Sequence, residues 1–566
     1  MKFLAKVLFT LLLLAALGVA GLYMMLQSHW GTNWVSRYIS ENSDYQLHFS
    51  KIEYRLSDPF HLLLNDVTLG HKGQAPLLTA KQVDLGLGLT QFVIPLHFPA
   101  IHLTEGVVML SDEHKLPPLS ADHLQLSRMK IENSQYMLPV TAEKVDGAIT
   151  PWKPVDGNVI GDKAHFQFSA SHIKLADFSG QNLLLEGMLA DHKLTVTNAG
   201  VDLAGGTLTG SAIRDAGGNW LINSLRLSGL HLQTTKSLND IFASVLALPS
   251  VHVKRLDVTN AQLEGEGWAA SDLDLSLDNL TLSNNDWQSN GGTLLLNAST
   301  IVKNGLQLSD PIINVSFSPQ GITIRQLSTR WAQGLIRTYG RWSRADKKLT
   351  LDDAALVGLE YTLPENWRDI WMAALPDWLN SVQVLHFSAN RNLIIDINPE
   401  FPFQMTSLEG NGSNLLLVKD HQWGIWGGKM SFNAFAATFN RVELYHPSIS
   451  LGSNDEQIEI SELSAFIKGG LLEANGTVTQ SPQRLTQLNL TGRNVPLSFL
   501  KNWGWPATVL QDTGRLEMTL DASLAAGTEL RKSMNATLSN SQGEKTVSMR
   551  MTQGMIVQSQ TGSTKR

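Results

Sequence analysis

The stretch SDLDLSLDNLTL, Ser271 to Leu282, indicates most clearly which fold the chain adopts. Its first half alternates leucines with polar residues, the period of two typical of a strand with one buried face: Leu273, Leu275 and Leu277 against Asp272, Asp274 and Ser276. At Asp278-Asn279 the alternation shifts by one residue, so that apolar residues stand at i, i+2, i+5 and i+7. A strand changes faces once in such a pattern, and a bulge at the polar step returns both apolar pairs to one interior. The stretch therefore predicts a bent strand in a curved sheet.

The same spacing recurs at five other places along the chain. The apolar sets are Leu62, Leu64, Val67 and Leu69; Leu124, Leu126, Met129 and Ile131; Leu225, Leu227, Leu230 and Leu232; Val251, Val253, Leu256 and Val258; and Val382, Val384, Phe387 and Ala389. Most of the steps between the pairs contain residues that tolerate a bulge. We therefore expect corners at Asn65-Asp66, Ser127-Arg128, Ser228-Gly229, Lys254-Arg255 and Leu385-His386.

Double glycines provide a second recurrent feature, because each leads into a short strand. They are Gly205-Gly206, Gly291-Gly292, Gly427-Gly428 and Gly469-Gly470. Glycine supplies the positive φ values of tight turns. The spacing of the pairs is irregular, which argues against a solenoid of fixed period. The chain is therefore predicted to be mainly β, as a long antiparallel array of hairpins with variable loops.

Short helices are expected to interrupt the strands at residues 30–39, 237–246, 364–379 and 495–505. The first is expected to lie against a membrane or the first sheet, and the other three to pack on the sheet as plugs or lids. From Met534 the composition becomes polar, which predicts a frayed tail, although Val547 to Met551 keep a strand pattern.

The amino-terminal segment predicts a single transmembrane anchor. Val7 to Leu26 contains 20 residues without a formal charge, and a helix of that length covers about 30 Å, the thickness of a bilayer core. Lys2 and Lys6 precede it and should stay in the cytoplasm, so the rest of the chain is exported. The anchor residues are Val7, Leu11, Leu14, Leu17, Leu22 and Leu26. The alternative is a cleaved signal peptide with a small-residue site at Gly18-Val19-Ala20, which also exports the body.

Composition excludes several classes of protein. The chain has 566 residues, 43% of them hydrophobic, so wholesale disorder is excluded. Its net charge of -7 gives no electrostatic footprint for nucleic acid. It contains no cysteine, which removes disulfides and cysteine-ligated zinc or iron-sulfur sites and suits an oxidising periplasm.

Candidate chemical motifs are weak throughout the chain. The 16 histidines are dispersed, and the two closest in sequence are His97 and His102. The sequence contains no metalloprotease, nucleophile-elbow or phosphate-loop motif. The match to G-x-G-x-x-A at residues 265–270 runs into a strand instead of a helix. Two further sets favour structural roles over calcium or ligand binding: Asp272, Asp274 and Asp278, and Trp367, Trp371 and Trp378. We expect no enzyme activity and no catalytic, metal or cofactor residues.

Five segments follow one another in a characteristic order along nearly the whole chain: the anchor at 7–26, the helix-to-strand entry at 34–47, the corner at 62–69, VDLAGGTLTG at 201–210, and NVPL at 494–497 leading to GRL at 514–516. In these segments and their order the sequence resembles the AsmA-like family, which belongs with the bridge-like lipid-transfer proteins of Gram-negative envelopes. The resemblance implies a bacterial inner-membrane protein, single pass, with its bulk in the periplasm as an elongated, curved, taco-like β-groove.

The resemblance also implies how the chain is divided. The expected parts are a cytoplasmic tail at 1–6, the anchor at 7–26, an AsmA/chorein-like groove segment at 27–200, a central hairpin array at 201–490, a carboxyl-terminal AsmA-like segment at 491–533 and a polar tail at 534–566.

The implied function is phospholipid transport or outer-membrane lipid homeostasis, without catalytic residues. The pattern and the resemblance together give the candidate lipid-groove residues Leu62, Leu64, Val67, Leu69, Leu225, Leu227, Leu273, Leu275 and Leu277. Expected partners are phospholipids and the inner membrane, with outer-membrane or periplasmic proteins as further candidates. One alternative is that the same residues fill closed sandwiches. Two others concern function: a non-enzymatic assembly factor for outer-membrane proteins, and an envelope hydrolase with an unrecognised site.

Overall fold

The computed structural model confirms a mainly β chain, with 70% of residues in strands and 8% in helices. The structure describes residues 28–563 except 56, 111–117, 134–139, 156–157, 176–177, 285, 400, 481, 507–512, 526 and 543–544; before residue 28 it describes 14, 17, 18, 21, 24 and 25. The chain divides into two units, which are described separately. Unit 1 is Met1–Glu266 with Asp272–Trp287, and unit 2 is Gly267–Ser271 with Gln288–Arg566.

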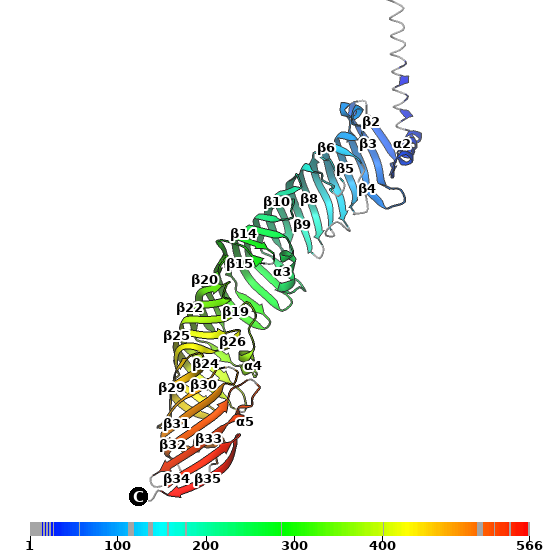
Figure 1. Ribbon diagram of the computed structural model, residues 1–566. Helices are drawn as coiled ribbons and strands as arrows, with labels where there is room; N and C mark the ends of the chain where they lie inside the picture. The colour runs from blue at the N-terminus through cyan, green and yellow to red at the C-terminus, as the bar shows by residue number, and fades with distance from the viewer. Residues whose placement is uncertain are drawn as a thin grey trace, which may run out of the picture. The chain divides into compact units, whose positions relative to one another are not determined.

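Unit 1 is a curved sheet whose strands mostly pair with the next strand in the chain, from β3 to β12 (Figure 1). The short β1 and β2 both pair with β3. Its elements are α2 (His29–Asn42), β1 (Tyr45–His48), β2 (Lys51–Arg55), β3 (Asp58–His71), β4 (Pro76–Gly86), η1 (Leu89–Phe92), β5 (His97–Leu110), β6 (Ser120–Asn133), β7 (Val140–Thr150), β8 (Lys163–Leu175), β9 (Phe178–Ala190), β10 (Lys193–Leu203), β11 (Gly206–Arg214), β12 (Trp220–Ser228), β13 (His231–Gln233), α3 (Leu238–Leu246), β14 (Ser250–Gly265), most of β15 (Trp268–Ser283) and β16 (Asp286–Trp287).

Unit 2 repeats this organisation, with strands pairing in chain order from β19 onward. Its elements are β17 (Gly292–Asn297), β18 (Thr300–Lys303), β19 (Leu306–Ser318), β20 (Gly321–Trp331), β21 (Gly334–Ser343), β22 (Lys348–Val357), β23 (Glu360–Thr362), α4 (Trp367–Met372), β24 (Ser381–Asp396), β25 (Phe403–Lys419), β26 (Gln422–Asn433), β27 (Ala436–Phe439), β28 (Val442–Ser453), β29 (Gln457–Ile467), β30 (Gly470–Thr479), β31 (Leu485–Pro496), η2 (Leu497–Lys501), β32 (Thr513–Ser523), α5 (Leu530–Ser533), β33 (Asn535–Gln542), β34 (Lys545–Thr552) and β35 (Met555–Ser563).

The predicted corners are confirmed at four of the six steps. The second residue of each of these steps has a left-handed backbone: Asp66 (φ 50°), Arg128 (φ 53°), Gly229 (φ 64°) and Asn279 (φ 53°). At Arg128 two residues of β6 oppose one residue of β7, which is a bulge. The bulge brings all four apolar residues of the pattern in β6 into one core: Leu124, Leu126, Met129 and Ile131.

The other two expected corners, at Lys254-Arg255 and Leu385-His386, are wrong. In β14 and β24 the left-handed residues lie further along, at Asn260 (φ 49°) and Arg391 (φ 51°). The amides of Gly229 and Gly358, corner residues beside these strands, bond to the carbonyls just before the bends, at Thr259 and Asn390. A bend must continue from one strand to the next, so register with the neighbour decides its position.

The double glycines behave as predicted in three cases. Gly205, Gly291 and Gly469 have positive φ values of 77°, 86° and 85° between strands. The expected turn at Gly427-Gly428 is wrong, because both residues lie within β26. Gly428 there has φ 100°, and a Cβ on it would lie 2.6 Å from the Asn414 carbonyl oxygen. The close approach of β25 therefore requires glycine in the strand interior.

The expected antiparallel array is wrong at three places, where neighbouring strands are parallel. These pairs are β5 with β6, β12 and β13 with β14, and β22 and β23 with β24. A parallel pair needs a crossover connection instead of a hairpin. Helix α3 lies in the connection from β13 to β14, and α4 in that from β23 to β24.

A helix lies in each predicted range, but the ranges 364–379 and 495–505 are too long, because α4 covers only Trp367–Met372 and η2 only Leu497–Lys501. Helices α3 and α4 also pack less than expected. In η2, Leu497, Phe499 and Leu500 are buried, which fits a plug. In contrast, Phe242 of α3 is 57% exposed and Ile370 of α4 is 55% exposed. Both helices serve as crossover connections, and only part of their apolar surface reaches the sheet. Helix α2 is confirmed; Val35 packs on the core of unit 1 while Trp30, Trp34 and Tyr38 are exposed.

The expected frayed tail is wrong for residues 535–542, 545–552 and 555–563, which form β33, β34 and β35. The strand pattern at Val547 to Met551 is confirmed within β34. Polar residues dominate the composition here, but they alternate with a buried set on the inner face: Ala536, Leu538, Val547, Met549 and Met551.

The anchor falls largely on residues that the structure does not describe, namely Val7, Leu11, Leu22 and Leu26 among those predicted. Leu14 and Leu17 are described as helical and exposed. Within the described part of the chain, no helix has both the length and the apolar character needed to span a bilayer.

Candidate functional site

The inner face of unit 1 is sealed in its first half. Leu64 and Val67 of β3 are buried with Met129 in a continuous apolar core, and Leu62 packs against it. Leu69 is half-buried. Of the predicted groove residues, this first set therefore behaves largely as ordinary core.

Further along unit 1 the same face is less covered. Leu225 and Leu227 of β12 and Leu275 and Leu277 of β15 are half-buried, and among the predicted residues of these two strands only Leu273 is buried. Alternation places them on the inner face in both regions. The apolar side chains on the inner face of the later strands are therefore partly exposed to solvent.

Unit 2 contains a large apolar cavity that sequence reasoning missed. Its volume is about 770 Å³, and its lining comes mainly from the inner faces of β25 to β34. Representative lining residues are Met405, Leu408, Phe432, Ala437, Phe439, Leu444, Ile449, Leu463, Ala474, Leu488, Leu490, Met518, Leu520 and Met551. None of the nine predicted groove residues lines it. Most strands contribute only one or two side chains, so no local motif identifies the site.

Aromatic side chains form one wall of the cavity. The ring of Phe439 stacks on Phe403 at a centroid distance of 5.6 Å and meets Phe401 edge-on at 5.7 Å. Phe432 contacts Phe387 edge-on at 6.1 Å. Such pairs pack large apolar surfaces in fixed orientations, so this wall is preformed.

The segment around η2 closes one end of the cavity. Lys501 to Trp505 all line it. The Asn440 side-chain amide donates to the Asn502 carbonyl oxygen at 2.8 Å, and the Asn502 amide donates to the Arg441 carbonyl oxygen at 3.3 Å. These bonds tie the segment to the turn between β27 and β28.

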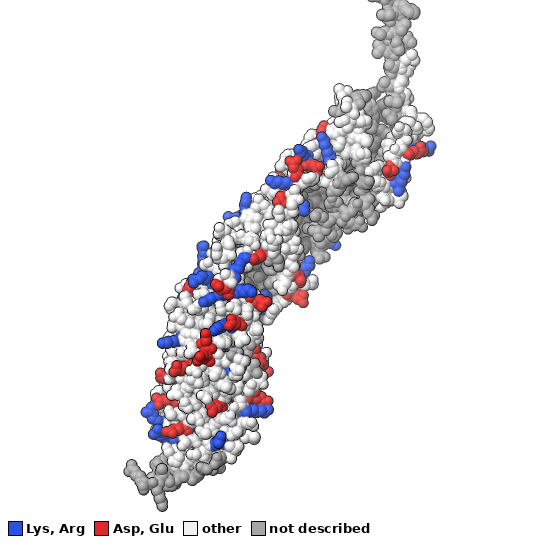
Figure 2. All heavy atoms as spheres, in the orientation of Figure 1, with Lys and Arg blue, Asp and Glu red and all other residues white. Residues whose placement is uncertain are grey.

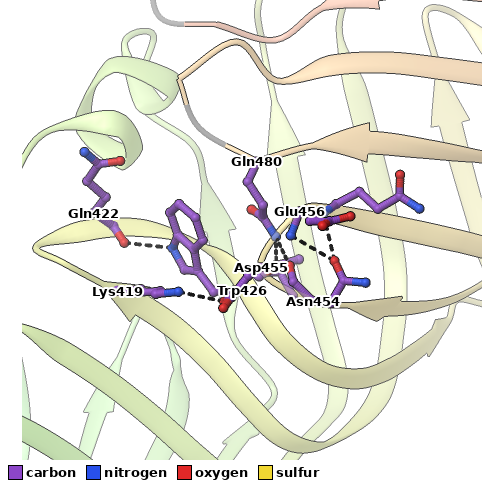
Figure 3. Close-up of polar contacts among 9 residues, drawn as sticks. Lys419, Gln422, Trp426, Asn454, Asp455, Glu456 and Gln480 are labelled. Atoms are coloured by element: carbon purple, nitrogen blue, oxygen red, sulfur yellow. Dashed lines mark hydrogen bonds and ion pairs between the residues drawn. The ribbon is translucent and has the colours of Figure 1, made fainter.

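A polar cluster ties the strand ends at the other end of β28 (Figure 3). The amide nitrogen of buried Gln480 donates to the carbonyl oxygens of Ile425 and Asn454, at 2.8 Å each. Lys419 forms an ion pair with Asp455 at 2.8 Å, and its ammonium lies 5.9 Å from the ring of Trp426. The cluster joins three turns, so it fixes the strands that form the cavity walls.

The exterior carries mixed charge. On the face in Figure 2, basic and acidic side chains are interspersed over both units. Arg128 and Lys81 both contact Glu105, for example, on neighbouring strands of unit 1. Charges of both signs are therefore mixed on this visible face.

The weaker sequence candidates have structural partners. Asp274 accepts a bond from the backbone amide of Asn260 at 2.8 Å, which satisfies the corner of β14. Trp367 donates to Asp396 at 3.1 Å, whereas Trp378 is 58% exposed, so the prediction of core packing is wrong for Trp378.

The two closest histidines also have structural partners, because His97 and His102 bond to the hydroxyls of Ser120 and Ser127. Among the described residues, no cluster of three or more potential ligands is placed to hold a metal ion.

The fold defines a mainly β protein built of curved sheets, and unit 2 has an apolar cavity on its inner face. The chain belongs to the AsmA family, which confirms the resemblance drawn from the order of its segments. It is 46% identical over 538 residues to the AsmA family protein YicH of Escherichia coli strain K12, a match that covers 95% of this chain and 95% of that protein. No family model matches the chain.

Proposed function

We propose that this chain is a lipid-handling protein of the bacterial inner membrane, with a single anchor and its bulk in the periplasm. In this proposal its apolar groove shelters phospholipid acyl chains, for lipid transport or outer-membrane lipid homeostasis, and the chain catalyses no reaction. The observation that carries the proposal is the cavity of about 770 Å³ in unit 2 with its largely apolar lining. Each methylene of an acyl chain in water costs about 0.8 kcal/mol, and such a lining removes that cost.

The half-buried leucines of unit 1 support lipid contact within that unit as well. Leu225, Leu227 and Leu275 lie on the inner face, where the corner residues bend the sheet. A wall of this kind needs no strong specific site, because hydrophobic burial is non-directional. Acyl chains could therefore occupy this face of unit 1 as well as the cavity of unit 2.

Exposed apolar residues near the start of unit 1 support the membrane location. Helix α2 directly follows the predicted anchor and exposes Trp30, Trp34 and Tyr38. In the connection from β4 to β5, Leu89 and Val93 are 80% and 82% exposed. Aromatic and aliphatic side chains of this kind favour the membrane interface.

The test measures lipid bound to the full chain purified in detergent, by mass spectrometry of the extract. Ala437 lines the cavity, and its neighbour Ala436 alternates to the other face of β27. We expect Ala437→Trp to reduce bound phospholipid several-fold by filling the cavity, whereas Ala436→Trp leaves it unchanged. Circular dichroism and thermal melting check that both variants fold. Absence of lipid from the unaltered chain would contradict the proposal.

A second candidate, a non-enzymatic assembly factor for outer-membrane proteins, is favoured by one observation. In the described part of unit 2, the final strand β35 pairs with β34 along one edge only. An open edge of this kind can accept a client strand. Photo-crosslinks from β35 to outer-membrane proteins, together with absence of bound lipid, would favour this candidate.

A further inference from the structure

The lining of the cavity in unit 2 is asymmetric in charge. It includes three cations, Arg441, Lys501 and Arg531, and no described aspartate or glutamate. All three cations are exposed, and none forms an ion pair with another described residue. Their neighbour Lys532 differs, because its ammonium contacts Glu529 at 2.6 Å. The cavity therefore combines an apolar interior with uncompensated positive charge at its rim.

The three cations converge on one loop, residues 501–504, although they come from separate parts of the chain. Arg441 is joined to this loop because its carbonyl oxygen accepts the bond from Asn502. On the other side, a Cβ built on Gly504 would lie 3.3 Å from an Nη of Arg531, so this guanidinium lies against the loop backbone. Lys501 belongs to the loop itself. All three cations therefore belong to the cavity lining on or beside this segment.

The acid closest in sequence to Arg441 in the described structure does not neutralise the rim. Glu443 alternates with buried Val442 and with cavity-lining Leu444 along β28, which places its carboxylate on the outer face. There it accepts a hydrogen bond from the Tyr445 hydroxyl at 3.1 Å.

The indole of Trp503 supplies an independent indication of a polar ligand group. Trp503 lines the cavity and packs edge-on against Phe499 at 5.0 Å. Its Nε1–H is buried and has no acceptor among the described residues. A buried donor without a partner is costly, and an ester, phosphate or carboxylate oxygen of a ligand would satisfy it.

We propose that the cavity of unit 2 selects phospholipids with a net negative headgroup over zwitterionic ones. The acyl chain occupies the apolar interior, the phosphate lies at Arg441, Lys501 and Arg531, and a lipid oxygen accepts from Trp503 Nε1. A zwitterionic lipid brings an ammonium group to the same three cations, which offsets its attraction. The inference rests on the proposed function, since it names the class of lipid that the groove takes.

The experiment exposes the full chain in detergent to an equimolar mixture of phosphatidylglycerol, phosphatidylethanolamine and palmitate, and quantifies each in the protein-bound fraction. The test variant carries Arg441→Gln, Lys501→Gln and Arg531→Gln. The matched control carries Arg337→Gln, Lys429→Gln and Lys468→Gln, three exposed cations of unit 2 that do not line the cavity. Trp503→Phe provides a fourth protein, which keeps an aromatic ring but loses the indole donor together with part of the ring volume. Thermal melting of each confirms folding.

We expect the unaltered chain and the control to enrich phosphatidylglycerol about tenfold over phosphatidylethanolamine, since three weak ionic contacts together reach that factor. The test variant should bind as much total lipid with the enrichment reduced to about twofold or less, and Trp503→Phe should lower lipid retention. Equal binding of the two phospholipids by the unaltered chain, enrichment that survives in the test variant, or palmitate bound in place of phosphatidylglycerol would each overturn the selectivity while leaving lipid handling intact. Absence of all three lipids would instead overturn the proposed function and the selectivity with it.

Discussion

At the scale of single residues, the curvature of the sheet depends on polar side chains in a left-handed backbone. These residues lie inside strands, where an unpaired amide would be costly, and carboxylates on the next strand accept from some of them. The amide of Arg128 donates to Asp146 at 3.0 Å, and that of Asn260 donates to Asp274 at 2.8 Å. Asp146 and Asp274 thus stabilise the corners in addition to solvating the outer face.

The first prediction concerns the backbone at one such corner. Lys144 of β7 is exposed and has φ 50°, a region that a β-branched residue strongly disfavours. Lys144→Val should destabilise unit 1 by about 1–2 kcal/mol. Lys144→Gly should be neutral or slightly stabilising, because glycine adopts this backbone freely. Thermal melting of the full chain measures both, and equal effects of the two substitutions would contradict the importance of the left-handed corner.

The second prediction concerns the pH dependence of a cross-strand pair. His61 of β3 contacts Asp84 of β4 at 3.0 Å, and this hydrogen bond raises the pKa of His61 above its usual value. The pair is therefore fully stabilising below about pH 6.5, the ordinary pKa of histidine, and loses its contribution as the pH rises through the raised pKa. Since the two side chains are 43% and 29% exposed, the contribution should be about 0.5 kcal/mol.

Melting temperatures of the unaltered chain and of Asp84→Asn, compared at about pH 5.5 and about pH 8, check this prediction. The unaltered chain should lose its advantage over Asp84→Asn at the higher pH. An advantage that grows with pH would contradict the assigned sign.

At the scale of secondary-structure elements, the β4–β5 connection has an unusual surface. The backbone amide of Leu87 donates to the Phe60 carbonyl oxygen at 2.6 Å. This bond brings Phe60, whose side chain is exposed, to the same edge as Leu89 and Val93. Exposed apolar groups gathered at one place mark an interaction site. Because the chain enters unit 1 from the predicted anchor, the bilayer surface is the expected contact.

A third prediction follows, and the absence of cysteine makes it accessible. A polarity-sensitive dye attached at Val93→Cys should shift to shorter wavelength when the full chain is reconstituted in vesicles, and lipids carrying a quencher should reduce its emission. The matched position is Lys72→Cys, exposed in the turn between β3 and β4, where neither change is expected. Identical spectra at the two positions would exclude a membrane contact of the connection.

How far the elements could be predicted depends on the range of the interactions that determine them. The strand at Ser271 to Leu282 and the corner at Asn279 follow from residues adjacent in sequence, and the prediction was correct. The corner at Asn260 could not be predicted in the same way, because register with β12 determines its place. The parallel pairing of β14 and β24 depends on crossovers that leave no local pattern beyond helices α3 and α4.

The cavity lies beyond the reach of sequence patterns for the same reason. Met405 and Met551 both line it although they are far apart in the chain. Their strands read as ordinary alternating strands, and only the packing of many such strands distinguishes a filled core from an accessible one. Arg441, Lys501 and Arg531 likewise converge through the loop at 501–504, which no spacing in the sequence indicates.

At the scale of the whole molecule, we propose that the apolar inner faces of both units contact lipid. Each unit offers a matched pair of neighbouring residues. Leu275 is half-buried on the inner face of β15 and Asp274 is exposed beside it. Leu490 of β31 lines the cavity, and Asn489 beside it is exposed. Variants at two adjacent positions should be produced in similar amounts and have the same local backbone. A difference in lipid labelling between them therefore reports which face of the strand contacts lipid.

The most direct measurement places a photo-crosslinking amino acid at each of these four positions in the full chain, in living cells whose phospholipids carry a phosphorus label. We expect lipid adducts at Leu275 and Leu490 and only background labelling at Asp274 and Asn489. Equal labelling within each pair, or absence of lipid at all four positions, would contradict this proposal.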